Sequence, residues 1–395
     1  MISFESVSVR RCSLIAVLLA ELSTTPAHGE TCEGRGILVD QDFAGGAYAT
    51  CVVDENNRVR LTITPENTPI NASPWYAFRV KSEQGGMHEI HLDYGEFKHR
   101  YPPDISYDGS QWRRLSDDAL SIGNGGSEAL LAIDLPAGLP VIIAAQPLLV
   151  SRDYRLWLDS LEKHDEIEVA QIGTTPGDRP LWRASTLPRG DTLLLLGRQH
   201  PPETTGAVAM MAFVERLLAD DTLANAFRAE VGLLIYPLIN PDGVDDGHWR
   251  HNSGGVDLNR DWGPFSQPET ASVAQNIDSF LLKNNSHLMT SIDFHSTWYE
   301  VFYTQDDRTA TIAPELLGDW LLHFNTEMQS IEPAFVLNRK PSHNPDKPTA
   351  KSYFFERYGV ASSTLEIGDA TDQQFIRRYA VIAAEALMTA WLGDQ

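Results

Sequence analysis

The stretch "TLLLLGRQHPPETTG", residues 192–206, joins a run of leucines to a turn that carries a histidine and a glutamate. The apolar run has the length of a strand, and its continuity is typical of a strand covered by helices on both faces. From Glu203 to Leu218, apolar residues recur at helical spacing. The stretch therefore predicts a strand, a turn and a helix, with His200 and Glu203 where open α/β sheets bind ligands.

Two prolines shape this turn. Pro201 and Pro202 stiffen it, and either can occupy the first position of the helix, where a backbone N–H would lack a partner. A rigid His-x-x-Glu turn can direct an imidazole and a carboxylate at one metal ion. The motif alone is weak, because a carboxylate at the start of a helix is also favoured by the helix dipole. The metal interpretation therefore depends on the rest of the chain.

Later segments add residues of the same kind. A second apolar run, residues 288–294, ends at His295, which supplies a third ligand. Two histidines and one glutamate form a catalytic zinc set that leaves a position for water. Three further motifs are "LLIYPLINPDG" at residues 233–243, "WRHNSGGVDLNRDW" at residues 249–262 and "SSTLEIG" at residues 362–368, which contains Glu366.

The chain of 395 residues is long enough for two domains, and its two parts differ in periodicity. Residues 30–150 contain short runs with period two, separated by Gly, Pro, Asn and Asp, which predict an N-terminal β-sandwich domain. Residues 151–395 alternate between helical and strand patterns, which predicts an α/β domain with a mixed, largely parallel sheet flanked by helices. The best candidate strands of the sandwich are residues 58–64, 75–80, 88–94 and 140–146.

Residues 1–29 have the pattern of a secretory signal peptide. Arg10 and Arg11 precede an apolar run at residues 13–20, and small residues follow up to Ala27. A buried N-terminal helix is the alternative. A signal peptide predicts a secreted or periplasmic protein.

The mature chain would retain Cys32 and Cys51, which are close enough in sequence to close a small loop. A disulfide and two unpaired buried thiols both stay open at this point. The formal net charge of -23 argues against nucleic acid as a partner, because phosphate binding needs a basic face. No segment after the signal reaches the roughly 18 apolar residues of a membrane span, so none is expected in the mature chain.

At these motifs the chain resembles the zinc metallocarboxypeptidases related to carboxypeptidase A. The resemblance covers residues 154–392, and the His-x-x-Glu turn, "NPDG", "GVDLNRDW", the later strand-end histidine and "TLEIG" occur in the family's order. A proline after the first ligand histidine and a sandwich before the peptidase domain are similar to the cytosolic, deglutamylating carboxypeptidases and their bacterial relatives. Digestive members carry an arginine where this chain has Pro202, so one substrate contact is missing.

The resemblance implies a metal site and a mechanism. His200, Glu203 and His295 would hold one Zn²⁺ per chain, which lowers the pKa of bound water and polarises the scissile carbonyl. Glu366 would take the proton of this water and pass it to the leaving amine. Arg250 would stabilise the oxyanion that forms at the carbonyl.

The resemblance also assigns residues around the substrate. Asn259 and Arg260 would bind the terminal carboxylate of the peptide, and Asp257 would accept the second N–H of His200. Surface ion pairs and turn structure are the alternative roles of these residues. Lys351 lies near the side-chain pocket, where a cation would favour a C-terminal Glu or Asp, although an exposed loop lysine is the preferred interpretation.

One part of the family's site has no clear counterpart. The family usually has a tyrosine upstream of the catalytic glutamate that closes over the substrate, yet residues 341–350 contain none. Tyr353 is the nearest candidate, at a different spacing. We therefore expect lid closure to differ from that of the family or to be absent.

The sequence thus predicts a zinc carboxypeptidase that acts on the C-termini of peptides or proteins. Three alternatives stay open. An aspartoacylase-like deacylase shares the zinc set and a similar "DLNR" run. Export would suit a carboxypeptidase for peptidoglycan stem peptides, and the missing tyrosine would suit a non-catalytic binding protein on the same scaffold.

Overall fold

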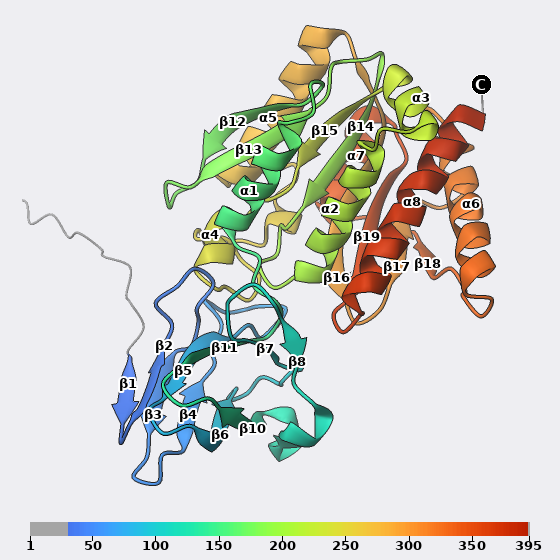
Figure 1. Ribbon diagram of the computed structural model, residues 1–395. Helices are drawn as coiled ribbons and strands as arrows, with labels where there is room; N and C mark the ends of the chain where they lie inside the picture. The colour runs from blue at the N-terminus through green and yellow to red at the C-terminus, as the bar shows by residue number, and fades with distance from the viewer. Residues whose placement is uncertain (1–30, 394–395) are drawn as a thin grey trace, which may run out of the picture.

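The computed structural model describes residues 31–393, which form an all-β unit and an α/β unit packed against each other (Figure 1). The expected signal peptide, residues 1–29, lies outside the described residues. The first α-helix, α1 (Ser151–Leu161), begins where the periodicity of the sequence changes. No helix among residues 31–393 is long and apolar enough to cross a membrane.

The all-β unit consists of two sheets that share one hydrophobic core. Their strand orders are β1-β2-β5-β11-β7-β8 and β3-β4-β6-β10-β9. Along β10 buried residues alternate with more exposed ones, as expected for a strand with one face against a core. The four candidate strands all overlap observed strands, and the sandwich is present. The strands are β1 (Cys32–Gly34), β2 (Ile37–Asp40), β3 (Thr50–Val53), β4 (Val59–Thr62), β5 (Ala77–Ser82), β6 (Gly86–Asp93), β7 (Asp104–Ser106), β8 (Arg113–Arg114), β9 (Leu120–Gly123), β10 (Glu128–Leu135) and β11 (Pro140–Ala144).

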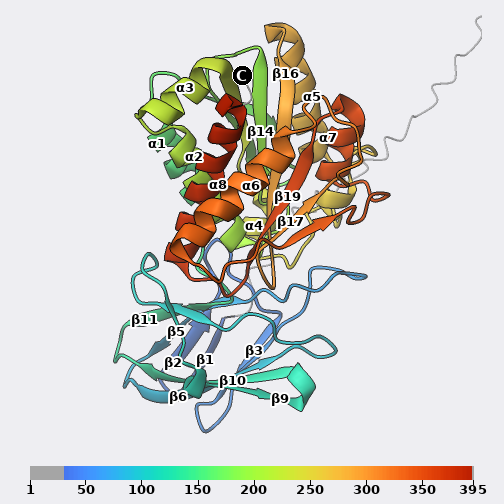
Figure 2. The same ribbon diagram turned by 90° about the vertical axis from the view of Figure 1, so that its right-hand side faces the viewer.

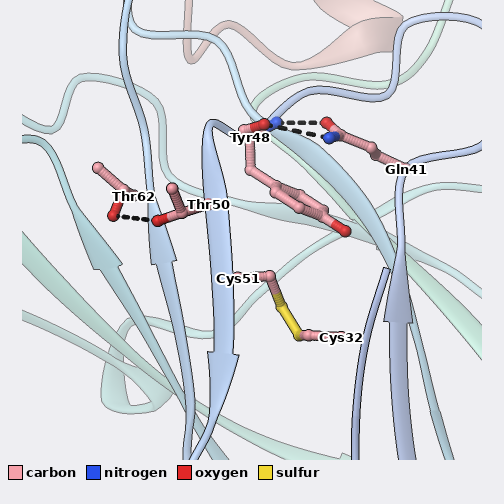
Figure 3. Close-up of a disulfide and its surroundings, with 6 residues drawn as sticks. All are labelled: Cys32, Gln41, Tyr48, Thr50, Cys51 and Thr62. Atoms are coloured by element: carbon pink, nitrogen blue, oxygen red, sulfur yellow. Dashed lines mark hydrogen bonds between the residues drawn. A yellow bond between two sulfur atoms is a disulfide. The ribbon is translucent and has the colours of Figure 1, made fainter. Parts of the chain in front are cut away.

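A disulfide between Cys32 and Cys51 links the two sheets (Figure 3). Cys32 lies in β1 and Cys51 in β3, and both strands are at an edge of their sheet. The bond settles the question that the sequence left open. Such a link restricts the unfolded chain and typically stabilises a domain by about 2–4 kcal/mol.

The α/β unit is built on an eight-stranded mixed sheet of order β12-β13-β15-β14-β16-β19-β17-β18. The central strands β15, β14, β16 and β19 are parallel, whereas β12, β13 and β17 join the sheet by antiparallel pairs. This matches the predicted mixed, largely parallel sheet. The strands are β12 (Glu168–Thr174), β13 (Pro180–Ser185), β14 (Asp191–Gly197), β15 (Val231–Tyr236), β16 (His287–Thr297), β17 (Val301–Thr304), β18 (Arg339–Pro341) and β19 (Ser362–Gly368).

Helices cover both faces of this sheet (Figures 1 and 2). Helix α1 lies on one face with α2 (Thr204–Leu217), α3 (Thr222–Glu230), α6 (Leu316–Ile331) and α8 (Gln373–Gly393), while α5 (Pro268–Asn284) and α7 (Ala350–Tyr358) lie on the other. In β14, Leu193 and Leu195 pack into the first core, and Leu194 and Leu196 pack into the second. The leucine run is continuous because each face of the strand meets a different helical layer.

The sandwich packs below the carboxyl ends of the central strands, close to α4 (Pro241–Asp245) (Figures 1 and 2). Trp249 of the α/β unit inserts into the sandwich core, where its ring meets Phe97 edge-on at a centroid distance of 5.1 Å. Gln146 of the sandwich donates to the carbonyl of Asp369, directly after β19. These contacts bring the sandwich to the edge of the sheet where the predicted site residues meet.

Candidate active site

The turn after β14 holds two of the predicted ligands in a fixed geometry. His200 and Glu203 are both buried, and Glu203 directly precedes α2 without capping it, because its carboxylate points toward the histidines. The buried side chain of Arg198 supports the turn from beneath, with Nε donating to the carbonyl of Pro201 at 2.9 Å. The first prediction from the opening stretch, a strand, a turn and a helix, is confirmed.

The three predicted ligands converge. His200 Nδ1 lies 2.8 Å from Glu203 Oε1, and His295 Nδ1 lies 2.7 Å from Glu203 Oε2. One ligand atom from each residue can be chosen so that all lie within 4.8 Å of one another. Two imidazole nitrogens and a carboxylate are the donor set that Zn²⁺ takes in catalytic sites. The residues present therefore fit a zinc ion.

Carboxylates hold the far side of each imidazole. Asp257 Oδ1 lies 2.9 Å from His200 Nε2, as predicted, and Asp293 Oδ2 lies 2.7 Å from His295 Nε2. A carboxylate at Nε2 leaves Nδ1 free of its proton and able to bind a metal. Asp293 was not among the residues predicted from the sequence, although its position two residues before His295 places both side chains on one face of β16.

Electrostatics separates the two glutamates of the site. Burial disfavours the charge of Glu203, but the adjacent His200 and His295 outweigh it and hold the pKa of Glu203 below its usual range. Glu366 stands beside His295 in the parallel pairing of β19 and β16. Burial, together with the negative charge of Glu203, raises the pKa of Glu366 to about 7. A carboxyl group in this range can exchange protons near neutral pH.

Arg250 lies on a loop that the sandwich holds in place. Its side chain is buried, and Nε donates to Asp257 Oδ2 at 2.7 Å. The carboxylate of Glu66, in the sandwich, accepts the backbone N–H groups of Trp249, Arg250 and His251 at 2.7, 3.0 and 2.6 Å. Glu66 precedes Arg250 by 184 residues, and no local motif marks it. The sequence therefore carries no signal for the role of Glu66.

Every predicted site residue except Asp257 lines one cavity of about 190 Å³, and Asp257 lies behind it. Arg260 lines this cavity, and one Nη of its guanidinium donates to the carbonyl of Asn259. The side-chain amide of Asn259 connects a predicted metal ligand to the start of α7. Its nitrogen lies 3.1 Å from His295 Nε2, and its oxygen accepts the backbone N–H of Ala350 at 2.9 Å.

Lys351 differs from the preferred sequence interpretation, which placed it exposed on a loop. It is the second residue of α7, only 5% exposed, and it lines the cavity. Thr349 caps α7 and the amide of Asn259 holds its first turn, so the helix start faces the site. Burial lowers the pKa of the ammonium group, and no carboxylate of the described residues pairs with it. A buried cation at the start of a helix is also opposed by the helix dipole.

Comparison with known proteins identifies the family. The sequence model described as "Zinc carboxypeptidase" matches residues 154–388, more than half of the chain. The chain belongs to the zinc carboxypeptidase family. A second model, the "Cytosolic carboxypeptidase N-terminal domain", matches residues 39–124, within the sandwich. This second match favours a carboxypeptidase over an aspartoacylase-like deacylase.

Individual relatives of this zinc carboxypeptidase are similar to it in sequence over part of the chain or in fold over most of it. Mouse cytosolic carboxypeptidase 6 is 29% identical over 156 residues, which cover 36% of this chain and 29% of the relative. The chain therefore spans under a third of that relative's length. Metallo-carboxypeptidases from Burkholderia cenocepacia (TM-score 0.75, 18% identity, 91% of this chain and 100% of that chain) and Pseudomonas aeruginosa (TM-score 0.68, 20% identity, 90% and 99%) share the fold, sandwich included.

The pocket tyrosine of this family member comes from an unexpected strand. Tyr353 packs with Trp262 and Phe265 outside the cavity, so it is not the lid residue that the sequence analysis considered. Tyr303 of β17 lines the cavity, and burial, together with the charge of Glu366, raises its pKa to about 12. The ring of His343 stacks on it at a centroid distance of 4.1 Å. The cavity therefore contains a tyrosine side chain. This tyrosine comes from β17 and not from the segment just before Glu366, where the family usually has one.

Proposed function

We propose that this protein is a zinc-dependent carboxypeptidase that removes the last residue from peptides or proteins. The observation that carries the proposal is one cavity that combines the His200, Glu203 and His295 group with Glu366 and with the cations Arg250, Arg260 and Lys351. The first four residues suit hydrolysis, and the cations suit an anionic substrate end.

The residues of the chain divide the work of hydrolysis. Zn²⁺, when bound, supplies a Lewis acid that polarises the scissile carbonyl and lowers the pKa of a water molecule. Glu366 takes the proton of the attacking water and delivers it to the departing amine. Arg250 donates to the oxygen on which negative charge develops, while Asp257 holds both Arg250 and the imidazole of His200.

Charge supports a free C-terminus as the substrate feature. The chain carries a formal net charge of -23, yet positive side chains line this cavity. Arg260 is suited to a terminal carboxylate, which a guanidinium can bind with two parallel hydrogen bonds. We propose that Asn259 lines this subsite and that the buried Lys351 binds the carboxylate of a C-terminal Glu or Asp.

Peptide pairs with a free acid or an amide at the C-terminus test the exopeptidase proposal. The zinc-loaded protein should cleave the free acid, and cleavage should stop with a chelator. The amide should be almost inert, because it lacks the charge that Arg260 pairs with, at a cost of several kcal/mol at the order-of-magnitude level. Arg260→Ala should slow only the free acid. Equal cleavage of acid and amide by the wild type would instead indicate an endopeptidase or a deacylase.

We further propose that the protein is exported, to the periplasm or outside the cell. Support comes from the signal-like residues 1–29 and from the disulfide between Cys32 and Cys51, since such bonds persist in oxidising compartments. The mouse relative named above is called cytosolic. Residues 1–29 fused to a reporter that is active only after export test this point, and a reporter retained in the cytosol would contradict it.

A further inference from the structure

The sandwich contributes a wall of the candidate active site that the proposed reaction leaves unused. Asn71, Ser73 and Arg100 line the same cavity as the metal-binding group and Glu366. Arg100 follows β6 in the chain, and 13% of its side chain is exposed. A cation from a second domain therefore faces the reacting centre.

The guanidinium of Arg100 is fixed by hydrogen bonds to two residues, and some of its N–H groups make no hydrogen bond within the described residues. Its Nε and one Nη lie 2.9 Å from Asp369 Oδ2, and the other Nη donates to Ser73 Oγ at 2.8 Å. These contacts leave N–H groups of the guanidinium without an acceptor among the described residues. Trp298 covers one face of the group, with 4.8 Å between the guanidinium carbon and the ring centroid. The edge of the guanidinium is therefore the part available to a ligand.

The ion pair with Asp369 places Arg100 near the strands that carry the site. Asp369 comes directly after β19, and its backbone N–H donates to the carbonyl of Thr297 at the end of β16 at 2.7 Å. Arg100 therefore lies past the ends of the two strands that carry His295 and Glu366. A peptide with its carboxylate at Arg260 and its scissile carbonyl at the metal-binding group can continue along the wall that the sandwich contributes to the same cavity.

The charge of the neighbouring Asp369 decides which kind of substrate group Arg100 is suited to bind. Asp369 offsets the charge of the guanidinium, so the pair has little net charge to attract a carboxylate of the substrate. A neutral acceptor with a strong dipole, the main-chain carbonyl of a peptide, needs no net charge and can use the free N–H groups.

We propose that Arg100 binds a main-chain carbonyl of the substrate upstream of the scissile bond, so that the sandwich domain recognises peptide length independently of side chains. The proposal rests on the carboxypeptidase function proposed above and extends it to the opposite side of the scissile bond. It also gives the sandwich a direct substrate contact in a chain that has Pro202 in the turn between two of the predicted metal ligands.

A ladder of peptides of two, three and four residues with identical last residues, in which the first residue lacks its amino group so that the shortest member has no carbonyl upstream of the scissile bond, tests this assignment on the zinc-loaded full chain. In the wild type, kcat/KM should rise once the peptide is long enough to reach Arg100. Arg100→Met should reduce the ratio of kcat/KM between the longest and the shortest peptide by about tenfold, the effect of one charge-assisted hydrogen bond. Arg79→Met, which breaks an ion pair with Asp40 in the same domain, should keep the ratio.

Asp369→Asn separates substrate binding from domain docking. It removes the charge that joins Arg100 to the α/β unit but leaves the guanidinium, so the length ratio should persist. If Asp369→Asn lowers the ratio as much as Arg100→Met does, Arg100 acts by docking the domains and the proposal is wrong.

A second substitution covers the case in which Arg100→Met does not fold. Arg100→Lys keeps the charge beside Asp369 but not the planar fork, so it should also lose most of the ratio, and an unchanged ratio would overturn the proposal. A wild type that cleaves no member of the ladder would contradict the carboxypeptidase function itself, and this inference with it. A wild type that is active and keeps its ratio without Arg100 contradicts this inference alone.

Discussion

The two domains contribute to the same cavity in different ways. In the α/β unit, His200, His295 and Glu366 stand at strand ends and point side chains at the reacting centre. In the sandwich, Glu66 touches none of these groups, yet it binds the backbone that carries Arg250. The contrast teaches that the α/β unit supplies the groups for the chemistry, whereas Glu66 of the sandwich positions the loop that carries one of them. Substitutions in the two domains should therefore fail in different ways.

The largest effect should come from Glu366, because it would handle the proton in every turnover. Glu366→Gln keeps the shape of the side chain and removes the base, so kcat should fall by about 10³-fold while zinc content stays near one ion per chain. Steady-state kinetics and metal analysis measure both. His295→Ala is the companion variant, which should lose most of the zinc. Near-normal turnover by Glu366→Gln would assign the base to another residue and weaken the contrast between the domains.

A substitution in the sandwich should reduce activity without touching the metal. In Glu66→Gln, a neutral amide replaces the carboxylate that accepts three backbone N–H groups, so the loop with Arg250 should shift. Small displacements of a catalytic group can cost about 10²-fold in kcat/KM. Zinc content should not change, and the exposed Glu96→Gln serves as the matched control. Loss of zinc together with activity would show that the sandwich supports the metal site as well.

Specificity should depend on the α/β unit. Lys351→Met removes a buried cation, so the preference for a C-terminal Glu over a C-terminal Ala should fall by about tenfold in kcat/KM, corresponding to one charged contact. Lys347→Met, on the exposed segment just before α7, should leave the preference intact. Peptides that differ only in the last residue provide the measurement. A wild type without preference for acidic residues would remove Lys351 from the substrate subsite.

The smallest effect concerns the stability of the sandwich. Burial lowers the pKa of His99 to about 4, whereas an unfolded histidine titrates near 6.5. Below about pH 6.5 the unfolded chain binds a proton at His99 that the folded chain does not bind, so the contribution of His99 to stability should fall by about 1 kcal/mol between pH 7 and pH 5.5. The difference in urea unfolding between the wild type and His99→Phe at the two pH values measures this contribution. His99→Phe should reduce the pH dependence, and the exposed His287→Gln should not.

The sequence by itself determined the order of elements and the metal-binding group. The leucine run of β14 is readable because both faces of the strand are covered, and period two in the sandwich reflects one covered face. His200, Glu203 and His295 are readable because they follow apolar runs, and parallel strands bring their carboxyl ends to one edge. Such signals are local, since each depends on a residue and its near neighbours in the chain.

Only the tertiary structure decided which distant residues complete the site. Arg100 lines the cavity and Glu66 binds the backbone around Arg250 only because two domains pack together, and no spacing in the sequence records these contacts. Tyr303 rather than Tyr353 lines the cavity because β17 joins the sheet beside β19. Lys351 is buried because Asn259 and Thr349 fix the start of its helix toward the site. Local patterns specify which face of a helix or strand is buried. Which other element that face packs against depends on the packing and charge compensation of the whole fold, to which residues far apart in the chain contribute together.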